Sequence, residues 1–396
     1  MFQLDLCLKK EMKIKMENVY FDNAATTRLD EDVLKEMMPY LTNKYGNASS
    51  IYKLGRESRK AVEDAREKIA EAINAEPEEI YFTAGGSESD NTILRGIAYS
   101  YKEKGNHIIT SKIEHPAILE TCKQLEKEGF EISYVGVDKN GIINLEELEN
   151  LIKENTILIS IMFANNEIGT IQPVEEIGKI AKRHNIIFHT DAVQAVGSVK
   201  IDVKQMDIAS LSMSAHKFYG PKGIGALYVK KGIRFQKFIN GGHQEKNKRA
   251  GTENVPAIVG MGKAIGLAYE HLDEHTDRIK ELRDYYIDEI QKRIPDVIVN
   301  GDMNKRLPGN ANISFENVDG EAMLLNLDLK GICASAGSAC SSGSLEASHV
   351  LLAIGVPADV AHSSLRVSIG KYNTKEEIDY LIDNLVEIVK SCKKSC

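Results

Sequence analysis

The sequence predicts an α/β protein with a large domain built on a mostly parallel central sheet and a smaller α/β domain at the C-terminal end. Strand-like and helix-like stretches alternate through most of the 396 residues, a pattern typical of helices packed on a parallel sheet. A long helical stretch from about 255 to 294 ends at Pro295, and shorter strands follow it. We expect a large domain at 19–265, whose first residues pack with the small domain, a small domain at 266–396 and a leader at 1–18.

Short runs of apolar and β-branched residues predict the strands of the sheet. Amphipathic runs between them, such as 58–73 and 174–184, predict the covering helices. Ligands of such sheets bind beyond the carboxyl ends of the strands, so functional residues should follow strands directly. The strand candidates are 79–83, 107–111, 132–137, 157–163, 186–191, 208–212 and 225–229.

Composition excludes several classes of partner. A net charge of -8 and a pI near 5.8 give no electrostatic case for binding nucleic acid or an anionic membrane. No apolar run approaches the roughly 20 residues of a membrane span, and residues 1–15 lack the apolar core and cleavage site of a secretory signal. The six cysteines are scattered without CxxC spacing, which favours a reducing cytoplasm over a disulfide scaffold or a zinc site.

Lys217 lies in a segment between two apolar alternating runs, 207–211 and 224–229, and is therefore expected in a turn between buried strands. A lysine at the mouth of a core is costly to keep charged, and its neutral amine is a nucleophile that forms Schiff bases. Taken alone, the same residue fits a lysine that extends out of a glycine-rich loop to solvent.

Asp191 closes an apolar strand, and a buried carboxylate needs a partner. A protonated pyridine nitrogen is a suitable one, because the carboxylate keeps the ring charged and the charged ring accepts electrons. Gln194 lies close enough in sequence to reach an oxygen substituent of the same ring. Asp191 and Lys217 end consecutive predicted strands about 26 residues apart, and together they predict a pyridoxal phosphate enzyme.

Three weaker signals also follow strands. Gly86 and Ser87 open a helix, whose N-terminal amides favour an anion such as phosphate, although both are also ordinary capping residues. His115 precedes Pro116 at a helix start, where an imidazole can stack on a flat ring and move protons or simply serve the structure. Asn166 can hydrogen-bond a carboxylate or a ring hydroxyl, or reflect turn chemistry.

A series of short motifs runs in order along the chain and makes it similar to a known family. The sequence resembles the cysteine desulfurases of the NifS/IscS family, within the fold-type I, class-V aminotransferase-like pyridoxal phosphate enzymes. The resemblance covers about 19–389. The motifs are Tyr20–Thr27, Gly46–Ser50, Glu88–Asn91, Glu114–His115, Asn165–Glu167, His189–Gln194, Ser214–Lys217, Arg249–Asn254, Gly337–Cys340 and Ser364–Ser368.

The resemblance implies pyridoxal 5'-phosphate as the cofactor, L-cysteine as the substrate and a homodimer as the assembly. A bidentate arginine suits a substrate carboxylate because its planar fork matches two oxygens. The implied roles are Lys217 for the Schiff base, His115 for ring stacking and proton transfer, Asp191 for the pyridine nitrogen, Gln194 for the ring oxygen, Gly86, Ser87, Ser214 and His216 for the phosphate together with Thr252 of the partner subunit, and Asn166 and Arg366 for the substrate carboxylate.

Cys340 separates a desulfurase from a transaminase. It lies in a run of small and polar residues, 334–344, that is expected to be a surface loop. The family resemblance implies that its thiolate takes the substrate sulfur as a persulfide for iron–sulfur clusters, transfer-RNA thiolation or another sulfur cofactor, through a sulfur-acceptor or scaffold protein. Free thiols have a pKa of about 8.5, so a nearby base or the cofactor complex must generate the thiolate. No metal is implied, beyond a transient cluster on Cys340.

Alternatives and departures remain open at this point. A selenocysteine lyase, another small-amino-acid transaminase or a non-catalytic partner subunit in iron–sulfur assembly fits the same fold. Ala48 and Tyr52 stand where the family often has proline and histidine. Cys333 is either a second sulfur station or a structural thiol, and no role is assigned to Cys392 and Cys396. The chain ends soon after the last expected helix, without the longer tail that housekeeping members use to dock a scaffold.

Overall fold

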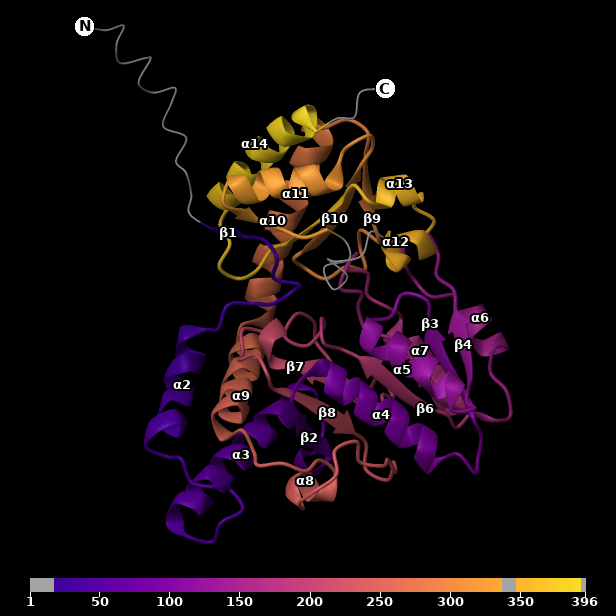
Figure 1. The fold of residues 1–396 in the computed structure, drawn as a ribbon, viewed down its shortest axis with the longest axis vertical. Helices are drawn as coiled ribbons and strands as arrows, with labels where there is room; N and C mark the ends of the chain where they lie inside the picture. Colours follow the sequence, from indigo (N-terminus) through magenta and orange to yellow (C-terminus); the bar gives the residue numbers. More distant parts are fainter. Residues whose placement is uncertain (1–17, 337–346, 393–396) are drawn as a thin grey trace, which may run out of the picture.

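The computed structural model describes residues 18–336 and 347–392. Figure 1 shows a large lower part built on the central sheet and a smaller upper part, joined by the helix α10 (Leu272–Arg293). The expected leader, except for its last residue, and the segment that contains Cys340 lie outside the described residues. None of the described helices combines the length and the apolar character needed to cross a membrane.

The central sheet has seven strands in the order β2-β8-β7-β6-β5-β3-β4. The pairs from β7 to β4 are parallel, and only β8 runs against its neighbours β2 and β7. The predicted α/β class with a mostly parallel sheet is therefore confirmed. The strands are β2 (Ile80–Thr83), β3 (His107–Ser111), β4 (Glu131–Val135), β5 (Thr156–Ser160), β6 (Ile187–Asp191), β7 (Ser210–Ser214) and β8 (Gly225–Val229).

Capping residues mark several helix starts in the sequence. His115 caps the helix that begins at Pro116, and Asn254 accepts a hydrogen bond from the Ala257 amide at the start of α9. Thr374 and Glu377 form a reciprocal capping box. The helices of the large domain are α2 (Glu31–Thr42), α3 (Lys53–Ala72), α4 (Gly86–Ser100), α5 (Pro116–Lys127), α6 (Leu145–Asn150), α7 (Val174–Arg183), α8 (Gln244–Asn247) and α9 (Val255–Glu270), with 3-10 turns at Pro77–Glu79 and Ala215–Lys217.

The small domain contains a three-stranded antiparallel sheet in the order β12-β10-β9. The N-terminal strand β1 (Val19–Tyr20) pairs in parallel with β11 (Ile332–Cys333), and Val19 and Phe21 lie in the same core as α10 and α14. The remaining elements are β9 (Val297–Asn300), β10 (Asn310–Phe315), β12 (Ser364–Ser368), α11 (Gly320–Leu329), α12 (His349–Ala353), α13 (Ala358–Ala361) and α14 (Lys375–Ser391).

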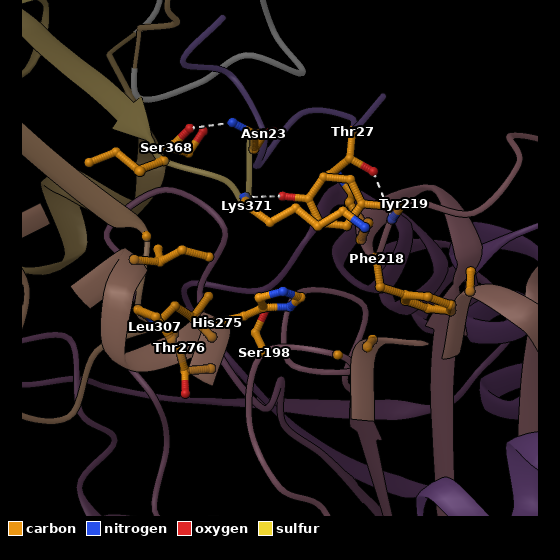
Figure 2. Close-up of a pocket in the computed structure, with 18 of the residues that line it drawn as sticks. Asn23, Thr27, Ser198, Phe218, Tyr219, His275, Thr276, Leu307, Ser368 and Lys371 are labelled. Atoms are coloured by element: carbon orange, nitrogen blue, oxygen red, sulfur yellow. Dashed lines mark hydrogen bonds between the residues drawn. The ribbon is translucent and has the colours of Figure 1, made fainter. Parts of the chain in front are cut away.

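The long helical stretch expected at 255–294 is two helices, interrupted at His271, whose φ of -117° and ψ of 23° are not helical. The break has a packing reason, because α9 buries Met261 and Ile265 in the large core while α10 buries Tyr286 and Ile290 in the small one. A cavity of about 290 Å³ remains at this junction, lined by residues of both domains (Figure 2).

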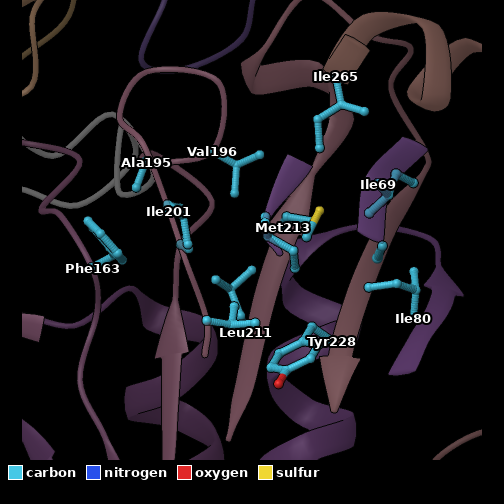
Figure 3. Close-up of a cluster of buried hydrophobic side chains, with 14 of the residues drawn as sticks. Ile69, Ile80, Phe163, Ala195, Val196, Ile201, Leu211, Met213, Tyr228 and Ile265 are labelled. Carbon is cyan, nitrogen blue, oxygen red and sulfur yellow. The ribbon is translucent and has the colours of Figure 1, made fainter. Parts of the chain in front are cut away.

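The central sheet separates two hydrophobic layers. Alternate residues of a strand point to opposite faces, so Leu211 and Met213 of β7 pack toward Ile69 and Ile265 of the helices α3 and α9 (Figure 3). The opposite face is covered by α4 and α5. On β7 that face carries only serines, and this places polar side chains beneath the start of α4.

Candidate active site

A cavity of about 260 Å³ opens at the carboxyl ends of β5, β6 and β7 and brings most of the predicted site residues together. Parallel strands deliver their C-terminal residues to one edge of the sheet, which is why residues far apart in sequence meet there. Thr252 does not line it, and Cys340 lies outside the described residues. The predicted residues that line the cavity are Gly86, Ser87, His115, Asn166, Asp191, Gln194, Ser214, His216, Lys217 and Arg366.

Lys217 is the last residue of the 3-10 turn that follows β7. Its Nζ donates hydrogen bonds to the carbonyl oxygens of Ala24 and Ala25, at 2.5 and 2.7 Å. Gln194 donates to the same Ala24 carbonyl at 2.9 Å. The Ala24 amide in turn donates to Ser368 of β12 at 2.8 Å. The segment after β1 therefore connects the lysine to the small domain.

Asp191 ends β6 at the base of the cavity and is 7% exposed. One carboxylate oxygen accepts the Val193 amide at 2.9 Å. Burial raises the pKa of Asp191, and His115 and Lys217 oppose that rise. A cationic ring nitrogen at this position would favour the ionised carboxylate in the same way.

The phosphate end of the site is built from closely packed backbone. A Cβ on Gly225 of β8 would lie 2.7 Å from the Cα of Gly85, and one on Gly86 would lie 2.6 Å from Val193 Cγ2. The absence of side chains leaves the N-terminal amides of α4 accessible to an anion. A neighbouring cavity of about 470 Å³ is lined by Gly85 and Gly86 and also by Lys222, which the sequence analysis did not identify.

His216 borders both cavities. Its Nδ1 lies 3.1 Å from the Thr26 hydroxyl. Burial, together with the positive charges of Lys217 and Lys222, lowers the pKa of His216 to about 4. The imidazole is therefore neutral at pH 7 and acts as a hydrogen-bonding group rather than a counter-charge.

Arg366 and Asn166 meet at the opposite end. The Arg366 guanidinium is 1% exposed and donates to the Asn166 carbonyl at 3.0 Å and to Asp22 Oδ1 at 2.8 Å. Among the described residues, its Nε–H has no hydrogen-bond partner. A buried donor without a partner is costly, so this end is suited to an arriving acceptor such as a carboxylate.

His115 is the N-cap of α5, as expected. Its Nδ1 accepts a hydrogen bond from the Ala117 amide at 3.1 Å. In the neutral ring the proton must then be on Nε2. The backbone thus fixes the tautomer of the histidine that lines the cavity.

The sequence analysis missed three buried acids around the site, Asp90, Glu114 and Glu167. Burial raises the pKa of Glu114 to about 8 and that of Glu167 to about 7. Asp90 shares the buried face of α4 with Ile93 and Ile97, so helical spacing is the signal that could have revealed it.

The cavity between the domains, shown in Figure 2, is adjacent to the candidate active site. The two share Ala24, Gln194 and Lys217 as lining residues. The interdomain cavity is lined by neither Asp191 nor Arg366. It therefore does not bring together the amine, the acid and the carboxylate-binding group.

The residues present fit pyridoxal phosphate. The glycine-lined start of α4, with Ser214 and His216, matches the hydrogen-bonding needs of a phosphate. Asp191 lies in the same cavity for a pyridine nitrogen, and Lys217 provides the amine. Together these groups match the hydrogen-bonding needs of one flat ring that has a phosphate at one side and a carboxylate-bearing substrate at the other.

The fold and the site define an enzyme of the class-V aminotransferase type, and the family described as Aminotransferase class-V matches residues 19–381. A cysteine desulfurase IscS of Clostridium botulinum is 55% identical over 94% of this chain and 95% of its own length. Another cysteine desulfurase IscS, of Methanosarcina thermophila, is 52% identical over 98% of this chain and 96% of its own. The chain belongs to the cysteine desulfurase family, whose members depend on pyridoxal phosphate.

Solved structures agree with this assignment. A NifS-like protein superposes with a TM-score of 0.89 at 41% identity, covering 94% of this chain and all (100%) of the other. SspA in complex with cysteine superposes with a TM-score of 0.80 at 38% identity, covering 90% of this chain and 99% of the other. The fold-type I architecture is therefore confirmed.

Proposed function

We propose that this protein is a cytoplasmic, homodimeric cysteine desulfurase that converts L-cysteine to L-alanine and passes the sulfur to Cys340 as a persulfide. The observation that carries the proposal is one cavity lined by Lys217, Asp191 and Arg366 together. These supply an amine nucleophile, a counter-charge for a pyridine nitrogen and a carboxylate-binding fork. Family membership supports the same activity.

The chain's own residues have separate tasks in this reaction. Pyridoxal phosphate, when bound, supplies the electron sink. Arg366 and Asn166 orient the substrate carboxylate, and Gln194 and Asp191 hold the oxygen and nitrogen of the ring. Lys217 Nζ takes the α-proton of cysteine.

Sulfur transfer and proton return complete the proposed reaction. The Cys340 thiolate forms an S–S bond to the substrate sulfur as the C–S bond breaks, and the electron pair of that bond remains with carbon. Protons returned to carbon leave alanine. His115, whose Nε2 carries the proton in the neutral ring, is the proton carrier on the face of the ring.

Two observations support a homodimer. Thr252 is exposed and lies outside both cavities of its own chain, as a residue serving the partner subunit would. The helix α2 exposes an apolar stripe of Leu34, Met38 and Leu41, which are 43%, 45% and 55% exposed. Light scattering on the eluting protein should give twice the chain mass, and a monomer would exclude this assembly.

The segment before Thr252 is fixed to the large domain. Glu245 accepts bidentate hydrogen bonds from Arg66 at 2.8 Å each and a third from the Phe82 amide at 2.8 Å. Residues 245–247 all have positive φ, between 46° and 63°, a costly conformation that the buried ion pair maintains. This rigidity supports a role for the segment in presenting Thr252.

Free thiols support the cytoplasmic assignment, since Cys122, Cys333 and Cys392 are all unpaired. Cys122 is buried, and burial raises its pKa to about 12, so it is inert. Cys333 is half-buried with a raised pKa, which supports a structural rather than a sulfur-carrying role. We propose a sulfur-acceptor or iron–sulfur scaffold protein as the physiological recipient.

The decisive experiment follows sulfur and alanine together. The purified enzyme is incubated with L-cysteine, alanine and sulfide are measured, and mass spectrometry locates the persulfide. Cys340→Ala should lose sulfide release and keep the visible absorbance of the cofactor, whereas Cys122→Ala should retain both. Lys217→Ala should lose the absorbance band of the lysine-bound cofactor.

Other outcomes would favour the alternatives. Sulfide release by Cys340→Ala would contradict the role of that thiol. Alanine formation from selenocysteine alone would favour a selenocysteine lyase. A colourless protein that binds no pyridoxal phosphate would favour a non-catalytic partner subunit.

A further inference from the structure

Asp90 is a buried acid to which the proposed reaction gives no task. It lies in the first turns of α4, just after the phosphate-binding Gly86 and Ser87, and lines the same cavity as Asp191. It is 1% exposed, and its Oδ1 has no hydrogen-bond partner in the part of the chain that the structure describes. A buried carboxylate with one oxygen unpaired is expensive to ionise.

The partners of Asp90 are all neutral. The Ser212 hydroxyl of β7 hydrogen-bonds its carboxyl group. His189 Nε2 lies 3.8 Å from Asp90 Oδ1 and 3.1 Å from the same serine hydroxyl. Burial lowers the pKa of His189 to about 3, so this imidazole carries no charge at pH 7. The Ser212 hydrogen bond lowers the pKa of Asp90, but neither of these two side chains carries a positive charge that would compensate an ionised Asp90.

Asp191 lies in the opposite situation. Burial raises its pKa, but it accepts a backbone amide from Val193 at 2.9 Å, and its interactions with His115 and Lys217 oppose that rise. Two carboxylates in one buried site repel each other strongly enough that only one of them ionises. The surroundings decide which one holds the proton.

We propose that Asp90 is a positioning residue that keeps the single proton of the Asp90–Asp191 pair, and so leaves Asp191 as the ionised member facing the pyridine nitrogen. This inference rests on the proposed cofactor site. Burial and the charge of Asp191 both raise the pKa of Asp90, which agrees with the geometry.

The other titratable groups around the pair are consistent with this arrangement. Glu114, which follows β3, is itself buried with a pKa of about 8 and adds no charge at pH 7. His115 and Lys217 face Asp191, and His189 faces Asp90. Among the described residues, no group of three or more His, Cys, Asp or Glu side chains is arranged to hold a metal ion.

A neutral Asp90 has a consequence for the cofactor. The pyridine nitrogen meets one negative charge rather than two, so the strength of its pairing is set by Asp191 alone. Raising the pH until Asp90 also ionises adds a second charge next to the ring. The visible band of the bound cofactor should then show an alkaline change that originates in Asp90.

The test locates the proton by infrared spectroscopy of protein labelled with carboxyl-¹³C aspartate, with and without pyridoxal phosphate. Asp90 and Asp191 are the described aspartates whose pKa is raised, so a protonated labelled carboxyl at pH 7 reports on this pair. We expect one such band in the wild type and its loss in Asp90→Asn. Glu114→Gln, the matched control, should keep it.

A second variant and a second readout keep the outcome clear. Should Asp90→Asn not fold, Asp90→Glu retains an acid but removes it from the labelled set, and the band must again vanish. The alkaline change of the visible band should also be lost in Asp90→Asn. Persistence of the labelled band in either variant, or its absence from the wild type, would overturn the proposal.

The same experiment separates the two levels of inference. A protein that binds no cofactor yet shows the labelled band would refute the proposed function and leave the proton on Asp90. An enzyme that binds pyridoxal phosphate but lacks the labelled carboxyl band would refute the proton on Asp90 and leave the proposed function intact.

Discussion

Glu114 gives the sharpest prediction, because its burial ties folding stability to pH. The side chain accepts hydrogen bonds at Oε1 from the Ser111 hydroxyl at 2.6 Å and the Met162 amide at 3.0 Å, and Oε2 has no partner. Its pKa rises from 4.5 to about 8, mainly through burial. Between pH 4.5 and about pH 8, Glu114 therefore holds a proton in the folded protein that it has released in the unfolded chain.

The direction of the pH dependence follows from this difference in bound protons between the folded and unfolded chain. The contribution of Glu114 is fully present below the unfolded pKa and is lost as pH rises toward the folded value. Each pH unit in this window lowers the free energy of unfolding by about 1.4 kcal/mol, or about 4 kcal/mol between pH 5 and pH 8. Glutamine keeps the Oε1 acceptor and does not titrate. Glu114→Gln should therefore gain about 4 kcal/mol relative to wild type over that range.

Urea unfolding of both proteins at several pH values measures this difference. Glu167 titrates in both proteins, and its contribution cancels in the comparison. Glu146→Gln, at an exposed position, is the control and should show no pH-dependent difference. A constant offset between Glu114→Gln and wild type from pH 5 to pH 8 would refute the reasoning.

Three further substitutions test other parts of the structure. Glu245→Ala leaves the buried Arg66 guanidinium without its buried carboxylate partner and should cost about 3–5 kcal/mol in thermal or urea unfolding. Gly86→Ala places a Cβ 2.6 Å from Val193 Cγ2 and should weaken pyridoxal phosphate binding at least about tenfold by fluorescence titration, because a loss of about 1.4 kcal/mol is tenfold. Arg366→Lys loses the planar fork and should raise KM for cysteine about 10- to 100-fold, since hydrogen bonds to charged groups contribute about 1.5–3 kcal/mol.

Glu245→Ala and Gly86→Ala each have a matched control. Glu63→Ala removes the half-exposed partner of Arg66 and should change stability by less than about 1 kcal/mol. Gly266→Ala adds a Cβ with no atom within 4 Å and should leave cofactor binding intact. A Glu245→Ala protein as stable as Glu63→Ala, or a Gly86→Ala protein that binds cofactor normally, would contradict the packing described. An unchanged KM in Arg366→Lys would place the substrate carboxylate elsewhere.

Much of the fold was predictable because its signals are local. The strands of the central sheet were recognised from apolar runs and lie within a few residues of their predicted bounds. The break at His271 was not predictable from the sequence, because the residues on both sides of it follow a helical pattern. The helix is interrupted only because α9 packs in one hydrophobic core and α10 packs in the other.

Local sequence patterns were enough to indicate candidate site residues at the ends of strands. Lys217 and Asp191 stand out because a charged group that ends an apolar run needs a reason to be there. The family motifs then indicated Arg366 as a candidate for binding the substrate carboxylate and Cys340 as the candidate thiol.

The tertiary structure alone decided which other acids surround them. Asp90 and Glu114 look like ordinary polar residues in sequence, one in the first turns of a helix and one beside a histidine. Their pKa values rise only when α4 and the segment after β3 close over the sheet and remove water from both carboxyl groups. Desolvation depends on everything packed around a group, and no local pattern of residues encodes it.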